Sequence, residues 1–154
     1  MICYTDGSCS GNPGPGGYGV IVLDNNYNFI DCKYYKDNNT TNNKMELSAI
    51  LYVLENYGLC NENVTVYSDS SYAINVYTSW MYSWSRNNWL KKDNKIPENL
   101  DIIKKYYNLC QQGYRINLEK VKGHSDNLWN NIVDLLATGT ITESEVKKLV
   151  EQNR

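Results

Sequence analysis

Four acidic side chains stand at positions where a globular protein rarely places an unpaired charge. Asp6 ends a run of β-prone residues and Asp69 follows another short apolar run, whereas Glu46 and Asp134 lie inside helical patterns. Removing an unpaired carboxylate from water is costly, so Asp6 either sits at an exposed strand end or faces a partner such as a metal cation. Converging carboxylates suit hard cations such as Mg²⁺ or Mn²⁺. Two such ions roughly 3.5–4 Å apart can activate a water molecule and stabilise the leaving oxygen of a phosphodiester.

Each acid also has a purely structural interpretation. Asp6 suits a turn, and Asp69 suits the N-cap of a helix. Asn43 and Glu46 have the spacing of a capping box, in which Glu46 bonds the cap backbone. Asp134 suits the solvated face of its helix, beside several asparagines. The joint occurrence of the four acids with specific flanking residues favours a shared site over these separate roles.

The elements that must position the acids follow from the hydrophobic pattern. Strands are predicted at 2–8, 18–23, 29–35, 64–67 and 116–121, and helices at 44–57, 70–84, 100–110, 128–137 and 143–150. Short connections between the first three strands favour an antiparallel meander, and the segment 37–43 reads as a polar loop. The order predicts an α/β fold with a mixed sheet flanked by helices. If the first and fourth strands are adjacent and parallel, Asp6 and Asp69 reach the sheet edge where α/β proteins bind ligands.

The amino-acid composition limits the number of domains and the kinds of partner. The chain has 154 residues, 42% of them hydrophobic and 21% charged, which suits one domain with a substantial core. The net charge of -2 argues against a broadly basic nucleic-acid coat but leaves room for a local basic patch. Five cysteines without paired spacing predict free thiols in a reducing compartment. No signal peptide or membrane-spanning run is evident, so we expect a cytoplasmic protein without a membrane partner.

The flanks of the acids resemble type 1 ribonuclease H. Residues 4–9 with 11–17 resemble the first-strand motif of that family, 40–47 its first-helix motif, 67–70 its third motif, and 121–124 with 134–137 its last. The resemblance runs from residue 1 to about 137 and implies a ribonuclease H-like fold with a five-stranded mixed sheet. By this match, the catalytic and metal-binding acids correspond to Asp6, Glu46, Asp69 and Asp134. It also implies two Mg²⁺ ions, with Mn²⁺ as a possible substitute.

The same match implies roles for other residues. His124, the single histidine of the chain, corresponds to a loop histidine that assists proton transfer or product departure; its alternative is a structural role. Positions that contact the nucleic acid correspond to Cys9, Asn12, Thr41, Asn42 and Asn43. For Asn12 and Thr41 the alternative is capping and turn formation.

Residues 80–97 resemble the basic handle of the longer family members. This segment supplies Trp80, Trp84, Lys91 and Lys92 as further substrate-binding candidates, and Lys95 belongs to the same basic stretch. The two tryptophans also suit core packing, in a stripe with Tyr77. The chain departs from the family pattern at Asn131, where an acid often stands, and at Ser71, where some members have glutamine.

The resemblance therefore implies an endonuclease that hydrolyses the RNA strand of an RNA–DNA hybrid by a two-metal-ion mechanism and leaves 5′-phosphates. Two alternatives remain: a non-catalytic hybrid-binding domain, and a related DNA nuclease of the same fold. We expect a monomer with one catalytic domain over 1–154, carrying the handle and an extra C-terminal helix over about 143–152.

Overall fold

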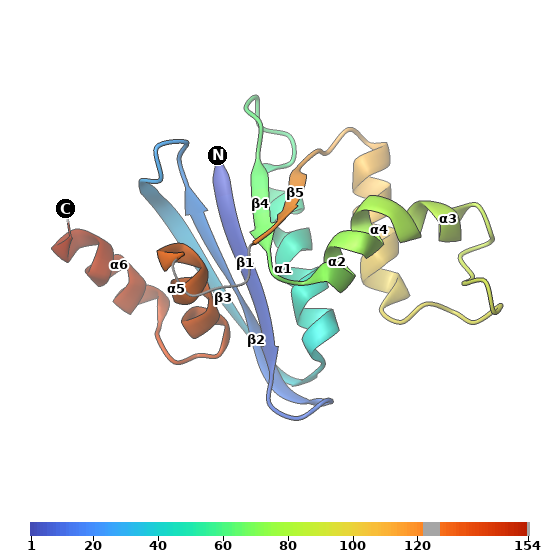
Figure 1. The fold of residues 1–154 in the computed structure, drawn as a ribbon, viewed down its shortest axis with the longest axis horizontal. Coiled ribbons are helices and arrows are strands. Elements are labelled where there is room, and N and C mark those ends of the chain that lie inside the picture. Colours follow the sequence, from blue (N-terminus) through green and yellow to red (C-terminus); the bar gives the residue numbers. More distant parts are fainter. Residues whose placement is uncertain (122–126, 154) are drawn as a thin grey trace.

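One mixed sheet organises the chain in the computed structural model, which describes residues 1–121 and 127–153 (Figure 1). Its strands are β1 (Ile2–Cys9), β2 (Gly14–Leu23), β3 (Phe29–Thr40), β4 (Thr65–Ser68) and β5 (Asn117–Lys120). Within these described ranges the order is β3-β2-β1-β4-β5, with β1, β2 and β3 antiparallel and β4 and β5 parallel to β1. The predicted α/β fold, with five strands and an antiparallel start, is confirmed.

Helices cover both faces of the sheet. They are α1 (Asn42–Tyr57), α2 (Ser71–Asn75), the π-helical η1 (Val76–Trp80), α3 (Met81–Ser85), α4 (Leu100–Gln111), α5 (Leu128–Ala137) and α6 (Glu143–Gln152). In Figure 1, α5 and α6 lie at the opposite side of the sheet from α2, α3 and α4. No helix in the described part of the chain combines the length and apolarity needed to cross a bilayer.

Two hydrophobic cores form because successive residues of a strand point to opposite faces. Cys3 of β1 belongs to the core that includes α1 and α4, whereas Tyr4 belongs to the core that includes α5 and α6. By the same alternation, Asp6 faces the side of the sheet that α5 covers, and Gly7 faces α1. The site described below depends on this alternation.

The predicted boundaries of two strands were wrong. β2 begins at Gly14 rather than at residue 18, and β3 continues to Thr40 through a segment predicted as polar loop. The added residues pair through their backbones, with Gly16 opposite Asp37 and Gly17 opposite residue 36. β3 is an edge strand, where polar side chains face water at little cost.

The helix predicted over 70–84 is divided by a π-helical segment. A π turn holds more residues than an α turn, so later side chains leave the regular helical stripe. Tyr77 stays in the core, where its hydroxyl donates to the Leu47 carbonyl at 2.8 Å and its ring stacks on Tyr106. Trp80 is 41% exposed, and Trp84 is half-buried against the core. The core-packing interpretation therefore holds for Tyr77 and partly for Trp84, but not for Trp80.

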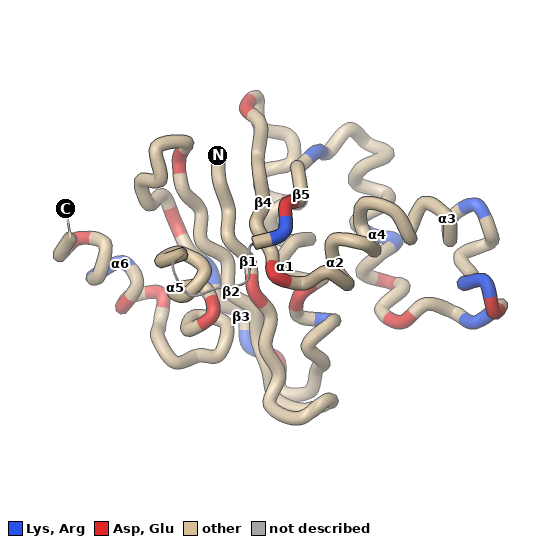
Figure 2. The backbone as a smooth tube through the Cα atoms, in the orientation of Figure 1, with Lys and Arg blue, Asp and Glu red and all other residues tan. Residues whose placement is uncertain are grey.

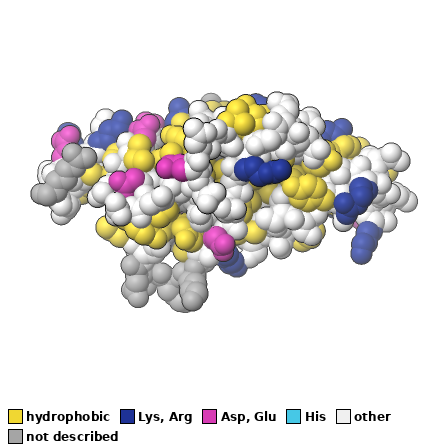
Figure 3. Space-filling view, turned by 90° about the horizontal axis from the view of Figure 1, so that it is seen from above, with side chains coloured by type: hydrophobic (Ala, Val, Ile, Leu, Met, Phe, Trp, Pro, Cys, Tyr) yellow, Lys and Arg dark blue, Asp and Glu magenta, His cyan; other side chains and the backbone are white. Residues whose placement is uncertain are grey.

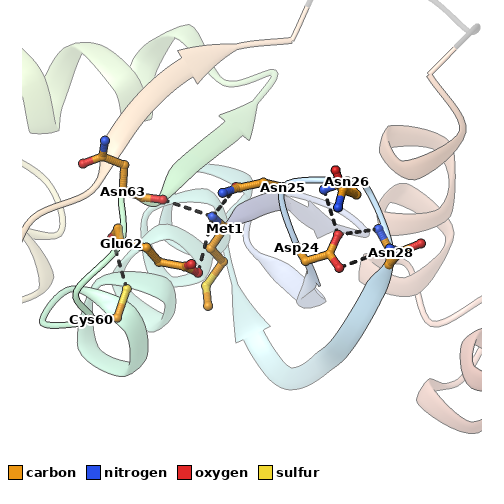
Figure 4. A network of polar contacts seen from close by, with 8 residues as sticks. All are labelled: Met1, Asp24, Asn25, Asn26, Asn28, Cys60, Glu62 and Asn63. Atoms are coloured by element: carbon orange, nitrogen blue, oxygen red, sulfur yellow. Dashed lines mark hydrogen bonds and ion pairs between the residues drawn. The ribbon is translucent and has the colours of Figure 1, made fainter.

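A polar network holds the start of β1, at the opposite end of the strand from the acidic residues (Figure 4). The Met1 ammonium donates to Asn25 Oδ1 at 2.5 Å and forms an ion pair with Glu62 Oε1 at 3.4 Å. In the turn between β2 and β3, which also contains Asn25, Asp24 Oδ1 accepts from the Asn28 amide at 2.9 Å. The central strand is therefore anchored at its start.

Candidate active site

The acids meet where β1 and β4 part. The last paired residues are Tyr4 and Tyr67, so Asp6 lies two positions beyond the pairing and Asp69 directly follows the end of β4. Parallel strands bring their carboxyl ends to one edge of the sheet, where α/β proteins bind ligands. The opening beyond the last pair lets side chains from both faces of the sheet reach the same space.

Glu46 enters this space because α1 approaches β1 closely at Gly7. A Cβ atom at Gly7 would lie 2.5 Å from the Glu46 amide nitrogen and 2.6 Å from the Met45 carbonyl carbon. Such separations are shorter than real Cβ contacts, so only glycine permits this approach. Gly7 also donates its amide to Asp6 Oδ1 at 3.0 Å. The glycine after the acid thus positions two of the four candidate acids.

Asp134 reaches the site from the other face, on α5. Gly19 pairs with Asp6 in the β1–β2 register, and a Cβ atom there would lie 3.0 Å from the Val133 carbonyl oxygen. Helix α5 therefore crosses the sheet directly over the strand pair that carries Asp6. A hydrogen bond between the Asp6 and Asp134 side chains is among the contacts that raise the pKa of Asp6.

The structure brings three of the acids into one tight cluster. One carboxylate oxygen each of Asp6, Glu46 and Asp69 lies within 4.8 Å of the other two. Asp6 and Glu46 are only 6% and 8% exposed, whereas Asp69 and Asp134 are exposed. The site thus has a buried floor of two carboxyl groups and a solvent-facing rim of two more.

Burial and mutual repulsion make this cluster unfavourable when ionised. Burial, followed by the charge of Glu46, raises the pKa of Asp6 to about 10. Burial also raises the pKa of Glu46, to about 7, although a hydrogen bond with Asp6 opposes the shift. Burial is likewise the main cause that raises the pKa of Asp69. Without a cation, therefore, the folded protein holds protons that an ordinary carboxylate would release.

The donor set fits a hard divalent cation. Glu46 Oε2 is buried and has no hydrogen-bond partner among the described residues. Leaving such an oxygen unsatisfied is costly, and a bound cation would both satisfy it and remove the repulsion between carboxylates. The clustered ligands are carboxylate oxygens alone, which Mg²⁺ and Mn²⁺ prefer.

The structural alternatives for Glu46 and Asp69 were wrong. The N-cap of α1 is Thr41, whose hydroxyl accepts from the Lys44 amide at 3.2 Å, so Glu46 does not occupy the capping-box position. The N-cap of α2 is Ser70 rather than Asp69. Both carboxylates are therefore free of the capping roles that the sequence allowed.

Candidate nucleic-acid contacts gather beside the acids, where the β1–β2 loop meets the start of α1. The Asn42 amide donates to Asn12 Oδ1 at 3.4 Å, and the Cys9 thiol donates to the Thr40 carbonyl at 3.2 Å. Thr41 caps α1, which agrees with its structural interpretation, and Asn43 lies in the first turn of the same helix. The loop and the helix start thus form one polar surface next to the cluster.

The handle extends away from the acids at the far end of the molecule (Figures 1 and 2). Trp80, Trp84 and Lys92 line one groove of this region together with Ser83, Asn87 and Leu90. Residues 91–95 form a turn, in which the Lys91 amide donates to the Lys95 carbonyl at 2.9 Å. Dark-blue cationic side chains gather at this end of the space-filling view (Figure 3). Lys91, Lys92 and Lys95 are called the handle lysines below.

His124 lies outside the described residues, so its predicted role stays a prediction. The sequence reasoning missed two kinds of residue. Gly7 and Gly19 position the acids. Gly7 directly follows Asp6 in the sequence, which was an available signal, whereas Gly19 lies opposite Asp6 only through the strand register. Lys120, at the end of β5, was also missed; a cation at the end of the last predicted strand was the signal.

Fold and site together define a class of protein: an α/β protein that presents a cluster of acidic side chains, suited to a divalent cation, at the carboxyl edge of a mixed sheet. The family model described as RNase H matches residues 1–142. A ribonuclease H of Caldanaerobacter subterraneus subsp. tengcongensis is 43% identical, over 97% of this chain and 93% of its own. The chain therefore belongs to the RNase H family of enzymes.

Solved structures agree with this assignment. LC9-RNase H1, described as a type 1 RNase H with the type 2 active-site motif, is similar with a TM-score of 0.72 and 27% identity, covering 93% of this chain and 74% of its own. LC11-RNase H1, solved in complex with an RNA/DNA hybrid, has a TM-score of 0.65 and 22% identity, covering 94% of this chain and 97% of its own. The resemblance to type 1 ribonuclease H is confirmed.

Proposed function

We propose that this protein hydrolyses the RNA strand of RNA–DNA hybrids as an endonuclease, leaves 5′-phosphates, and uses two Mg²⁺ ions that Mn²⁺ can replace. The observation that carries the proposal is the convergence of Asp6, Glu46 and Asp69 within 4.8 Å, in a chain of the RNase H family. Asp134 is assigned as the fourth ligand because its helix lies over β1 at Asp6.

The four acids differ in burial, and their proposed roles differ accordingly. When bound, the two ions supply an activated water and stabilise the leaving oxygen of the phosphodiester. Asp6 and Glu46, at the floor, give up their shared hydrogen bond and retained protons so that their oxygens can act as ligands. Asp69 and Asp134, at the exposed rim, face the side from which a nucleic acid arrives. His124 is assigned to move a proton or to help the cleaved phosphate leave.

The polar surface beside the cluster is assigned to substrate recognition. Cys9, Asn12, Thr41, Asn42 and Asn43 surround the start of α1, where backbone amides and the helix dipole favour phosphate. Recognition of the 2′-hydroxyl is what lets a protein tell RNA from DNA at a given site. The similarity to LC11-RNase H1, solved with an RNA/DNA hybrid, supports the same substrate class.

The handle is assigned to the hybrid backbone outside the cleavage site. Its lysines are suited to phosphate contacts, and the exposed Trp80 offers an aromatic face on the same groove as Trp84. We assign one catalytic domain to the whole chain, acting as a monomer. The five free cysteines support a reducing compartment such as the cytoplasm.

A cleavage assay on three end-labelled substrates tests the proposal. The protein is incubated with an RNA–DNA hybrid, duplex DNA and duplex RNA, each with and without Mg²⁺. We expect internal cleavage of the RNA strand of the hybrid alone, and only with the metal. Binding of the hybrid without cleavage would instead support the non-catalytic alternative, and cleavage of duplex DNA would support the DNA nuclease.

A further inference from the structure

A lysine stands at the rim of the acidic cluster on the β5 side. Lys120 is the last residue of β5 and pairs with Ser68, so it lies at the same sheet edge as Asp69. Its ammonium donates a hydrogen bond to Ser71 Oγ, in the first turn of α2. The amide of the next residue, Val121, donates to the Ser68 carbonyl at 2.9 Å, which holds this end of β5 beside the strand that precedes Asp69. In Figure 2 a blue stretch ends β5 next to α2.

In the described part of the chain, the Lys120 ammonium shares a sheet edge with Asp69 but forms no ion pair with an acid. Lys120 is exposed, and the ion pairs found among the described residues join other side chains. An ammonium has three donors, of which the Ser71 contact uses one. A lysine that served only to hold Asp69 would be expected to form an ion pair with it. Among residues 1–121 and 127–153, its hydrogen-bond partner is a serine instead, and its remaining donors have no partner there.

The position lies on the route that a bound hybrid must take. The scissile phosphate must reach the acidic cluster, and α2 and η1 lead from there to the handle (Figure 1). A polyanion that approaches four carboxylates meets repulsion that a cation at the rim offsets. Lysine suits this task because its ammonium is a compact point charge on a flexible stem.

We infer that Lys120 is a substrate-positioning residue that binds a backbone phosphate of the cleaved strand next to the acidic cluster. The inference rests on the proposed function and extends it to a residue outside the matched motifs. The cleaved strand is favoured over its complement because Lys120 adjoins Asp69, whose assigned ligand position is next to the scissile phosphate. Ser71 holds the ammonium in place through one donor while another donor binds the phosphate.

The first test compares Lys120→Gln with Lys148→Gln, a matched exposed lysine on α6 for which the described residues show no ion pair. Hybrid binding is measured by fluorescence anisotropy in EDTA, which prevents cleavage, across a range of salt concentrations. Removing one cation that binds a phosphate should lower the slope of log K against log salt by about 0.7–0.9 and weaken binding roughly three- to tenfold near 0.1 M salt. Lys148→Gln should match the wild type. An unchanged slope in Lys120→Gln would overturn the inference.

The second test identifies the strand. Single neutral methylphosphonates are placed at successive positions of the RNA strand, and in a second series of the DNA strand. At the phosphate that Lys120 contacts, the methylphosphonate should weaken binding by the wild type. It should not weaken binding by Lys120→Gln beyond the loss that this variant already shows with the unmodified hybrid. Such coupling in the RNA strand supports the inference, whereas coupling in the DNA strand, or at no position, overturns it.

Turnover separates positioning from chemistry. With Mg²⁺, Lys120→Gln should raise KM about three- to tenfold and leave kcat within about twofold, and Lys120→Arg should restore KM. A loss confined to kcat would overturn the positioning role. Wild-type protein that fails to cleave the hybrid would refute the proposed function itself, whereas wild-type cleavage with an unaltered Lys120→Gln would refute this inference alone.

Discussion

Replacing Asp6 by asparagine should stabilise the metal-free protein while abolishing cleavage. In the unfolded chain, Asp6 ionises at its ordinary pKa of 3.8, whereas in the folded protein burial and Glu46 raise that pKa to about 10. The folded state therefore binds more protons than the unfolded state, and its stability falls as pH rises above about 4. The stability lost in this range is the cost of burying the Asp6 carboxyl group near Glu46.

The magnitude follows from the width of that pH range. Near pH 7 the solution lies about three units above the ordinary pKa, and each unit corresponds to about 1.4 kcal/mol, so proton uptake costs the folded state at most about 4 kcal/mol. Asparagine keeps the size of the side chain and can donate to Glu46, but has no proton to take up. We expect Asp6→Asn to be more stable than the wild type by about 1–4 kcal/mol near pH 7 in EDTA. Mg²⁺ should stabilise the wild type only, because the variant lacks a ligand at the floor of the site.

Urea denaturation followed by circular dichroism tests this reasoning. The wild type, Asp6→Asn and Glu151→Gln are compared in EDTA near pH 7 and near pH 4. Glu151→Gln is the control, since that exposed carboxylate should change stability by less than about 0.5 kcal/mol. The advantage of Asp6→Asn should shrink near pH 4, where the unfolded chain is also largely protonated. An Asp6→Asn variant that is no more stable than the wild type at either pH would refute the linkage, and one that cleaves normally would refute the two-metal proposal.

Four further outcomes are expected. Gly7→Ala should lower the free energy of unfolding by about 1–3 kcal/mol in a urea melt, because its Cβ would collide with the backbone of α1. The variant should also be stabilised less by Mg²⁺. Wild-type values for both quantities would mean that the close approach does not position Glu46. Thr41→Ala should cost about 1 kcal/mol by loss of the N-cap, and Thr41→Ser should restore it; equal melts for the two variants would contradict the cap. His124→Ala should slow cleavage about 10²–10⁴-fold yet bind Mg²⁺ almost normally in a thermal titration, and would have to be reassigned as a ligand if metal binding vanished. Replacing the handle lysines by alanine should lower the salt slope of hybrid binding by about 0.7–0.9 for each phosphate that the variant no longer binds, and an unchanged slope would show that the handle does not touch the backbone.

Much of the fold was predictable because local patterns carry it. Alternation placed the strands, helical spacing placed α1, α4, α5 and α6, and the capping box of Thr142 and Glu145 starts α6. The predictions failed where tertiary contacts outweigh local preference. β2 begins early because the backbones of Gly16 and Gly17 complete the pairing with β3, which needs no apolar side chains. The π-helical turn at η1 leaves no local pattern, yet it turns Trp80 out of the core.

The sequence by itself identified the four acids and the flanking motifs that relate them to a family, since both are properties of residue type and short spacing. Only the tertiary structure decided how these residues meet. Asp6 and Glu46 are forty positions apart along the chain, and their contact depends on a helix resting against a glycine. The capping of α2 by Ser70 leaves Asp69 free to face the cluster, and the pairing of β4 with β5 places Lys120 beside it. Distances between remote residues arise from sheet register and packing, which no local pattern encodes.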